Sequence, residues 1–388
     1  MNEPWAGDVL ADPALLVPGI ADRANLQPIY LNTTAAIRAA EAGAGGRPRI
    51  VFSEGVTWDD IFPLGFDTLP GASDGLGAIF PPMIYTAIVL KCLGVPESDP
   101  EFCWAMRQLD DLMIAEDDTL RLQPCLSPVW DTALATIGVI DAGQPADSNE
   151  TVAAIDWLLA KEVRTRGDWA DRTHAEPAGW FFEYENAFYP DVDDTAMVLI
   201  AFSRLLPDGQ GAAWSLEWLS DGRGGSQLAL SGRSSSAGAA IRELEHLQPL
   251  LDAVRRGVGW LKALQSRNGG WGAFDADNTR EVFTKVPFAD HNAMIDPSTA
   301  DITARILEAF GGLNLTSSNA HDWLQGALDF VWNDQCPDSA WFGRWGVNYL
   351  YGTWQVIQGL TRYGIAAEHP RLQSAADCKR GCSAAMPY

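Results

Sequence analysis

The chain has 388 residues and a formal net charge of −24. This acidity excludes nucleic acids as partners and electrostatic docking on anionic lipid. No apolar run approaches the roughly 20 residues that a membrane-spanning helix needs, so any contact with a membrane would be limited to one leaflet. The amino-terminal sequence MNEPWAGDVL is acidic and lacks an apolar core, which predicts no signal peptide.

Tryptophan and cysteine usage adds two expectations. Sixteen tryptophans indicate either repeated packing anchors or an aromatic-lined cavity, because Trp is a large hydrophobe with an electron-rich face. The six cysteines lack the paired spacing of a metal or disulfide framework. They predict reduced and mostly buried thiols.

Helical periodicity dominates the chain after its first 70 residues, which show weak periodicity and many Gly and Pro. Several segments begin at Pro or near Asp and Thr and then repeat apolar residues at three- and four-residue spacing. Strand-like alternation is scarce. We therefore expect helices at Pro81–Gly94, Val129–Gly143, Asp193–Leu206 and Asp301–Leu313.

An internal repeat organises these helices. The segments WLLAKEVRTRGDW, WLKALQSRNGGW and FVWNDQCPDSAW share a helix end, a Gln or Glu, a polar turn and a final Trp. We interpret their last residues, Trp169, Trp271 and Trp341, as anchors that tie neighbouring helices. The two intervals are 102 and 70 residues, so about 32 residues are extra in the first. We assign them to an inserted Gly/Ser-rich loop near Pro207–Ala240.

Repeated helix pairs with a period of tens of residues predict an all-α fold, either a solenoid or a closed α/α barrel. Within it, the stretch YPDVDDTAMVLIAF places Asp191, Asp193 and Asp194 directly before an apolar run. One interpretation is a helix N-cap with solvated carboxylates. The other is a buried cluster, in which repulsion and desolvation keep a proton on one member.

The motifs LSPVWDTALA, YPDVDDTA, LQSRNGGWGAFDADN, VPFADHNAMIDPSTADITARILE and WFGRWGVNYLYGTW occur in this order. Together they resemble the bacterial squalene–hopene cyclases, over about Gly75 to Pro370. The resemblance implies a two-domain terpene cyclase architecture of α/α barrels with QW-type repeats. Residues 1–122 would then be part of an inserted barrel domain, and residues 123–388 would be a catalytic barrel. The chain is expected to be truncated at both ends relative to this family.

The resemblance also implies site residues. Asp193 would be the general acid that protonates an alkene, with Asp191 and Asp194 shaping its proton affinity. Aromatic side chains would stabilise the migrating cation, although core packing is the plainer interpretation of each ring. Arg305 would stabilise the carboxylate left after proton transfer, with a surface salt bridge as the alternative. The cavity set is Trp130, Phe182, Phe274, Phe288, Trp345, Tyr351, Ile79 and Pro81, and the polar set is Asp131, Asp296, Asp301 and Arg305.

The implied activity is that of an isomerase, cyclising squalene to hopene or hopanol without metal or cofactor. The implied setting is the cytoplasmic face of a membrane, with peripheral, monotopic attachment and a possible homodimer. Two alternatives remain at this stage: a non-catalytic truncated remnant of such a cyclase, and a class II diterpene cyclase. The latter would need a basic patch for a diphosphate, which this acidic chain does not obviously offer.

Overall fold

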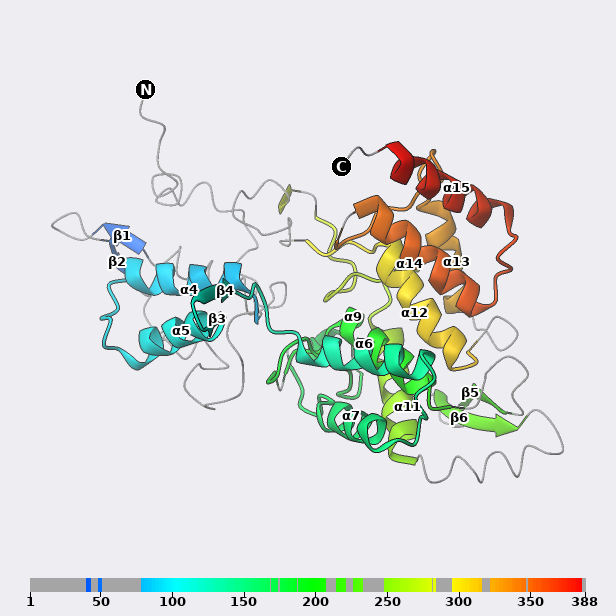
Figure 1. Ribbon diagram of the computed structural model, residues 1–388, viewed down its shortest axis with the longest axis horizontal. Coiled ribbons are helices and arrows are strands. Elements are labelled where there is room, and N and C mark those ends of the chain that lie inside the picture. The colour runs from blue at the N-terminus through cyan, green and yellow to red at the C-terminus, as the bar shows by residue number, and fades with distance from the viewer. Residues whose placement is uncertain are drawn as a thin grey trace. The chain divides into compact units, whose positions relative to one another are not determined.

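The computed structural model describes residues 40–42, 48–50, 78–167, 169–173, 175–186, 188–206, 214–220, 226–232, 248–280, 282–283, 295–315, 322–346 and 348–385 (Figure 1). The chain divides into two units. One comprises Met1–Ser127 with Glu183–Ala187, and the other comprises Pro128–Phe182 with Phe188–Tyr388. None of the helices in the described ranges combines the length and apolar composition of a membrane span.

The first unit contains a helix pair followed by a hairpin. Helix α4 (Phe80–Cys92) has Pro in its first turn, and α5 (Pro100–Asp111) packs against it. Strands β3 (Met113–Glu116) and β4 (Thr119–Leu122) pair antiparallel, directly after α5. A shorter antiparallel pair lies earlier in the chain, between β1 (Ala40–Ala42) and β2 (Pro48–Ile50).

The second unit is built from two layers of helices, as expected of an α/α barrel. The inner helices pack against one another in chain order, and each also contacts a helix of the outer layer (Figure 1). The inner helices are α6 (Pro128–Asp141), α9 (Val192–Ser203), α12 (Ala300–Gly312) and α14 (Asn348–Tyr363), and the outer ones are α7 (Asn149–Ala160), α11 (Gln248–Ala263), α13 (Asp322–Asn333) and α15 (Pro370–Ala385).

The inner layer is the core of this unit. Every residue of α9 is buried, and so is every residue of α12 except Gly311. The sequence of α9 explains this, because a helix that is apolar nearly all round must be covered on all sides. Helix α12 carries three charged residues into the same interior, Asp301, Arg305 and Glu308.

Each of the inner helices α9, α12 and α14 is tied to the outer helix that precedes it by one buried Trp. The indole Nε1 of Trp271 donates to the carbonyl of Leu261 at 2.7 Å, and its backbone N–H donates to the hydroxyl of Thr303 at 3.1 Å. Trp341 bonds in the same way to the carbonyl of Val331 and the hydroxyl of Thr353. The interpretation of Trp271 and Trp341 as anchors fits these contacts.

The structure corrects one of the three predicted anchors, because Trp169 does not make the equivalent bonds. The equivalent bonds belong to Trp180, whose Nε1 donates to the carbonyl of Leu158 at 2.6 Å and whose N–H donates to the hydroxyl of Thr195 at 2.9 Å. Trp169 is only partly buried and donates to the carbonyl of Phe188. The turn here is longer, because a short helix, α8 (Ala170–Thr173), precedes the true anchor.

The corrected alignment shortens the insertion. Trp180 precedes Trp271 by 91 residues, so the excess over the 70-residue interval is about 21 residues. The segment predicted as an irregular loop also contains an antiparallel hairpin, formed by β5 (Trp214–Ser220) and β6 (Ser226–Gly232). The prediction of mostly buried cysteines is wrong for the four whose surroundings are described. Cys92 and Cys103 are exposed, and Cys125 and Cys336 are half-buried; all four are free thiols.

The repeat differs at the position of the turn glutamine. Gln265 donates from its amide to the carbonyls of Gly269 and Trp323, at 2.6 and 2.9 Å. Gln335 donates in the same way to the carbonyl of Ser339. The first repeat has Glu162 here, which lacks an amide donor.

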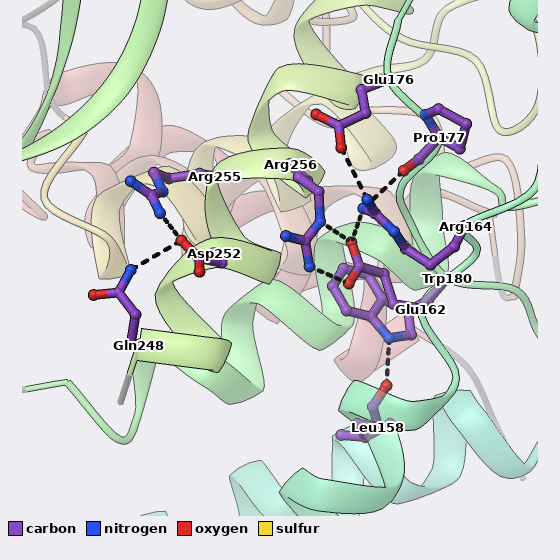
Figure 2. Close-up of polar contacts among 10 residues, drawn as sticks. All are labelled: Leu158, Glu162, Arg164, Glu176, Pro177, Trp180, Gln248, Asp252, Arg255 and Arg256. Carbon is purple, nitrogen blue, oxygen red and sulfur yellow. Dashed lines mark hydrogen bonds and ion pairs between the residues drawn. The ribbon is translucent and has the colours of Figure 1, made fainter. Parts of the chain in front are cut away.

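Two arginines replace the missing donor, as Figure 2 shows. Glu162 accepts from Arg256 at 2.7 and 2.5 Å and from Arg164 at 3.2 Å. Arg164 also donates to the carbonyl of Pro177 and to the carboxylate of Glu176, at 3.0 and 2.9 Å. The turn is thereby tied to the next outer helix through charge-assisted bonds.

Glu162→Ala is expected to lower the free energy of unfolding by about 1–3 kcal/mol, because it strips a largely buried carboxylate from Arg256. Asp252→Ala is the matched control on α11. Asp252 accepts from Gln248 and Arg255 on an exposed face (Figure 2), so its loss should cost less than about 1 kcal/mol. Urea unfolding followed by tryptophan fluorescence measures both values. Equal losses would contradict the structural role of Glu162.

Candidate active site

The three clustered aspartates lie at the start of α9 and are buried. Asp191, Asp193 and Asp194 are 7%, 7% and 3% exposed. Asp191 is the N-cap, and its carboxylate accepts from the N–H of Asp194 at 2.7 Å. The N-cap interpretation is therefore right for the geometry of Asp191, but its solvated carboxylates are not found, because the inner helix begins inside the core.

Two loops hold this helix start in place. The N–H of Asp191 donates to the carbonyl of Trp180, and the N–H of Val192 donates to the carbonyl of Ala273, each at 2.8 Å. Both carbonyls lie at or next to the anchor tryptophans. The repeat architecture thus positions the acids directly.

Burial favours the protonated form of Asp191, the first residue of the cluster. Burial raises the pKa of Asp191 to about 7; hydrogen bonds from Asp194 oppose this increase, and the charge of Asp193 adds to it.

Arg305 is the cation that faces the cluster. It is 1% exposed, and its Nη1 forms an ion pair with the carboxylate of Asp193. Its Nη2 donates to the hydroxyl of Tyr351 and to the amide oxygen of Gln355, the latter at 3.2 Å. Burial by itself would lower the pKa of Arg305, but Asp193 and Tyr351 raise it, so the guanidinium stays charged. The alternative of a surface salt bridge is wrong, because the pair lies in the interior.

Two of the predicted cavity rings face this guanidinium. The Cζ atom of Arg305 lies 4.9 Å from the ring centre of Trp130, on α6, and 5.8 Å from that of Tyr351, on α14. Aromatic faces attract cations at such distances. Trp130 and Tyr351 therefore already stabilise a resident cation next to the acid.

Asp296 organises the loop that carries Phe274. Its carboxylate accepts from the backbone N–H groups of Ala273, Phe274 and Asp275, at 3.0, 2.6 and 2.7 Å. Burial raises the pKa of Asp296 to about 6, against these three hydrogen bonds. The same loop provides the Ala273 carbonyl that binds the start of α9.

Asp301 organises the loop that carries Trp345. Its carboxylate accepts from the N–H of Arg344 at 2.8 Å, and the Arg344 side chain donates to the carbonyl of Ile295. The guanidinium of Arg344 lies 5.4 Å from the ring centre of Trp345. Burial raises the pKa of Asp301, and a hydrogen bond from Thr299 opposes this increase.

The other predicted residues are not joined to this network by the described contacts. Phe182 is half-buried, with its carbonyl accepting from the N–H of Val129, and Phe274 is 39% exposed. Asp131 is exposed in the first turn of α6. Phe288 lies outside the described residues, and Ile79 and Pro81 belong to the first unit, at the start of α4. Their roles in a cavity stay predictions.

A family model described as the squalene-hopene cyclase C-terminal domain matches residues 126–216 and 237–382, and the model of the N-terminal domain matches residues 70–118. The chain belongs to the squalene–hopene cyclase family. The unmatched residues 217–236 lie within the segment predicted as an insertion.

Curated relatives agree with this assignment. The squalene–hopene cyclase of Zymomonas mobilis is 35% identical over 312 residues, which cover 78% of this chain and 42% of that protein. The enzyme of Bradyrhizobium diazoefficiens is 34% identical, with 78% and 41% covered, and that of Alicyclobacillus acidocaldarius is 36% identical, with 76% and 41% covered. The chain therefore spans about two fifths of the length of these cyclases.

Sequence analysis missed three polar residues that continue the network from Arg305, namely Gln355, Glu308 and Gln358. Gln355 bonds to Arg305 and donates to Glu308 at 3.0 Å, and Gln358 donates to the other oxygen of Glu308 at 2.8 Å. Helical spacing was the available signal. Gln355 follows Tyr351 by four residues and Glu308 follows Arg305 by three, so each pair shares a helix face.

The raised pKa of Asp191 predicts a pH-dependent stability. At Asp191 the native state binds more protons than the unfolded state between about pH 4 and 7, so the contribution of this group to the free energy of unfolding falls as pH rises, by up to about 1.4 kcal/mol per pH unit. Asp191→Asn keeps the capping oxygen and removes the titration. We expect its loss of stability from pH 5 to pH 7 to be about 1–3 kcal/mol smaller than that of the parent protein.

Unfolding by guanidinium chloride at pH 5 and pH 7 measures the difference between the two proteins. The titrations of Asp296 and Asp334, whose pKa values burial raises to about 6, are shared by parent and variant and cancel. Asp329→Asn, on an exposed position of α13, is the control and should behave like the parent. Identical pH dependence in parent and Asp191→Asn would refute the assignment.

Proposed function

We propose that this chain is a triterpene cyclase of the squalene–hopene type, an isomerase that protonates a terminal alkene of squalene and guides its polycyclisation to hopene and hopanol. The observation that supports this most is the buried ion pair between Asp193 and Arg305, which lies beside Asp191, whose pKa burial raises to about 7. We further propose that residues 123–388 are the catalytic barrel and residues 1–122 are part of the inserted domain.

The first step is proton transfer from Asp193, after Asp193 has received the proton held by its neighbour Asp191, whose pKa burial raises. Squalene has no polar group, so the acid must protonate an unactivated double bond, which requires a strong acid in a dry site. The proton adds to the terminal alkene and forms a C–H bond and a tertiary carbocation. Each following double bond then attacks the cation and forms a C–C bond.

The reaction closes without a net change in protons. Loss of a proton from the final cation gives hopene, whereas addition of water followed by loss of a proton gives hopanol. One proton enters and one leaves, so neither a metal nor a redox cofactor is required. Arg305 stabilises the carboxylate that remains on Asp193, and Asp191 supplies the proton that Asp193 transfers.

Aromatic side chains accompany the migrating charge. Trp130, Phe182, Phe274, Phe288, Trp345 and Tyr351 are the proposed set, and the cavity roles of Ile79 and Pro81 stay predictions. Each desolvated ring contributes about 0.5–2 kcal/mol of cation stabilisation. The loops held by Asp296 and Asp301 support the positions of Phe274 and Trp345.

Squalene resides in membranes because it is wholly apolar. We therefore propose peripheral, monotopic attachment at the cytoplasmic leaflet, with squalene entering from the lipid. Attachment would rest on apolar side chains rather than on charge, since the chain is acidic. The possible homodimer stays a prediction.

Incubation of the detergent-solubilised protein with squalene, followed by gas chromatography, tests the proposal. We expect hopene and hopanol as products, and loss of both with Asp193→Asn. Absence of any cyclised product from the folded parent protein would contradict the proposal and favour the non-catalytic alternative.

A further inference from the structure

A line of hydrogen-bonded polar groups extends from Asp193, and all of them are buried except its half-buried last residue, Gln358. It leads from Asp193 to Arg305, then to Gln355, Glu308 and Gln358. Gln355 is 1% exposed and Glu308 is 4% exposed. The chemistry proposed above uses only the first two of these residues. The chemistry leaves without a role the buried Gln355 and Glu308 and the half-buried Gln358.

We propose that Gln355 and Glu308 are positioning residues that hold the guanidinium of Arg305 against Asp193. The catalytic consequence of this inference rests on the proposed function. The contacts from which it is argued are independent of that function. Neither residue touches the reacting atoms. Both act through Arg305.

The direction of the Gln355 amide carries the argument. An amide has one accepting end and one donating end, whereas a carboxylate only accepts. Glu308 accepts from the Gln355 nitrogen at 3.0 Å, which turns the Gln355 oxygen toward Arg305, at 3.2 Å from Nη2. A flipped amide would present its N–H groups to the guanidinium and would leave buried donors unpaired. Glu308 therefore selects the orientation that attracts Arg305.

The two helices that carry this line are packed too closely to adjust. Gly359 of α14 lies over α12, where an added Cβ would come within 2.1 Å of the carbonyl of Ala304. Ala304 is the residue before Arg305, so the backbone beside the cation is fixed. With the backbone fixed, only the Gln355 amide can still change its orientation. Its hydrogen bond to Glu308 prevents this change.

The groups that face Arg305 determine what its displacement would do. Asp193 lies on α9, with Asp191 beside it, and Asp301 lies on the same helix as Arg305. Tyr351 on α14 accepts a hydrogen bond, and the ring of Trp130 on α6 covers the guanidinium. A nearby cation favours the ionised form of carboxyl groups. Moving it away raises the proton affinity of the cluster and weakens the acid.

Gln355→Leu tests the role directly. We expect kcat for squalene to fall about tenfold, with KM changed less than about twofold, because the acid is weakened and binding is not. The alkaline limb of the kcat–pH profile should move upward by at least about half a pH unit. Gln358→Leu is the matched control. It makes the same change one turn later on α14, at a residue that binds Glu308 but has no bond to Arg305 among the described contacts, and its profile should match the parent.

Glu308→Gln separates positioning from simple charge and preserves side-chain size. If Glu308 acted only through its charge, removing that charge would favour ionisation of the cluster and lower the midpoint of the alkaline limb. Positioning predicts the opposite shift, because an amide at position 308 has one accepting oxygen instead of two, so Gln355 and Gln358 compete for it and the Gln355 amide is no longer held in one orientation. The exchange of both residues, Gln355→Glu with Glu308→Gln, keeps an acceptor toward Arg305 and a donor between the helices. It should restore the parent profile.

A measurement that needs no catalytic turnover distinguishes the positioning role from the proposed cyclase function. Infrared difference spectra between the protein and its Asp191→Asn variant follow the carboxylic C=O band of the cluster against pH. We expect its midpoint to rise in Gln355→Leu and Glu308→Gln and to stay unchanged in Gln358→Leu. This result in a protein that does not convert squalene would refute the proposed function and support the positioning. A midpoint that does not rise, or rises equally in Gln358→Leu, would overturn the positioning.

Discussion

Asp193→Asn is expected to lower squalene conversion by at least about 10³-fold, because it removes the only proposed proton donor to the alkene. The substitution is nearly isosteric, and the amide oxygen still accepts from Arg305. The fold should therefore persist, which circular dichroism and the unfolding midpoint check. Products are measured by gas chromatography after short and extended incubations.

Asp329→Asn provides the comparison for this experiment. It makes the same chemical change on the exposed side of α13, and its activity should equal that of the parent. If Asp193→Asn keeps its turnover while the parent is active, Asp193 is not the donor. Asp191 would then be the next residue to replace, since its pKa is raised to about 7.

Arg305→Met should lower the free energy of unfolding by about 3–5 kcal/mol, because it leaves the buried Asp193 without its cation. Adding Asp193→Asn to this variant should recover most of the loss, since the unpaired charge is then removed. The double-mutant cycle, measured by urea unfolding at pH 7, isolates the coupling between the two residues.

Arg267→Met is the control for the ion pair. Arg267 pairs with Asp277 at 2.9 Å, but its side chain is 90% exposed, so its replacement should change the free energy of unfolding far less than Arg305→Met does. A similar small loss for Arg305→Met, or no recovery in the double variant, would contradict a buried, coupled pair. Squalene turnover of Arg305→Met should also fall, because the carboxylate formed on proton transfer is no longer stabilised.

Local sequence patterns located the helices well. The helix expected at Asp193–Leu206 is α9, at Val192–Ser203, and the helix expected at Asp301–Leu313 is α12, at Ala300–Gly312. Caps and apolar periodicity act within a few residues, so they can be seen without the fold. The family resemblance, which the family models confirm, rested on long motifs in a set order.

The alignment of the repeats needed the structure. Two tryptophans, Trp169 and Trp180, follow the first of the three repeated helix ends. Trp169 lies two residues after Gly167, which is the spacing expected of an anchor, so the sequence favours the wrong residue. Only hydrogen bonds between distant segments distinguish them, such as the bond from the Trp180 indole to the carbonyl of Leu158. The hairpins β3–β4 and β5–β6 were likewise missed, because short strands within long connections leave little periodic signal.

The charged residues of α12 show what the sequence determines by itself and what the tertiary structure determines. The spacing of Asp301, Arg305 and Glu308 places them on one helix face, and the sequence by itself establishes this. The same spacing describes a solvated charged stripe, so the sequence cannot say whether that face meets water or the interior. The tertiary structure decides it, because α9 and α14 pack on α12 and remove its charges from solvent. Once they are buried, each charge must find a partner, and Asp193 and Gln355 become the partners of Arg305.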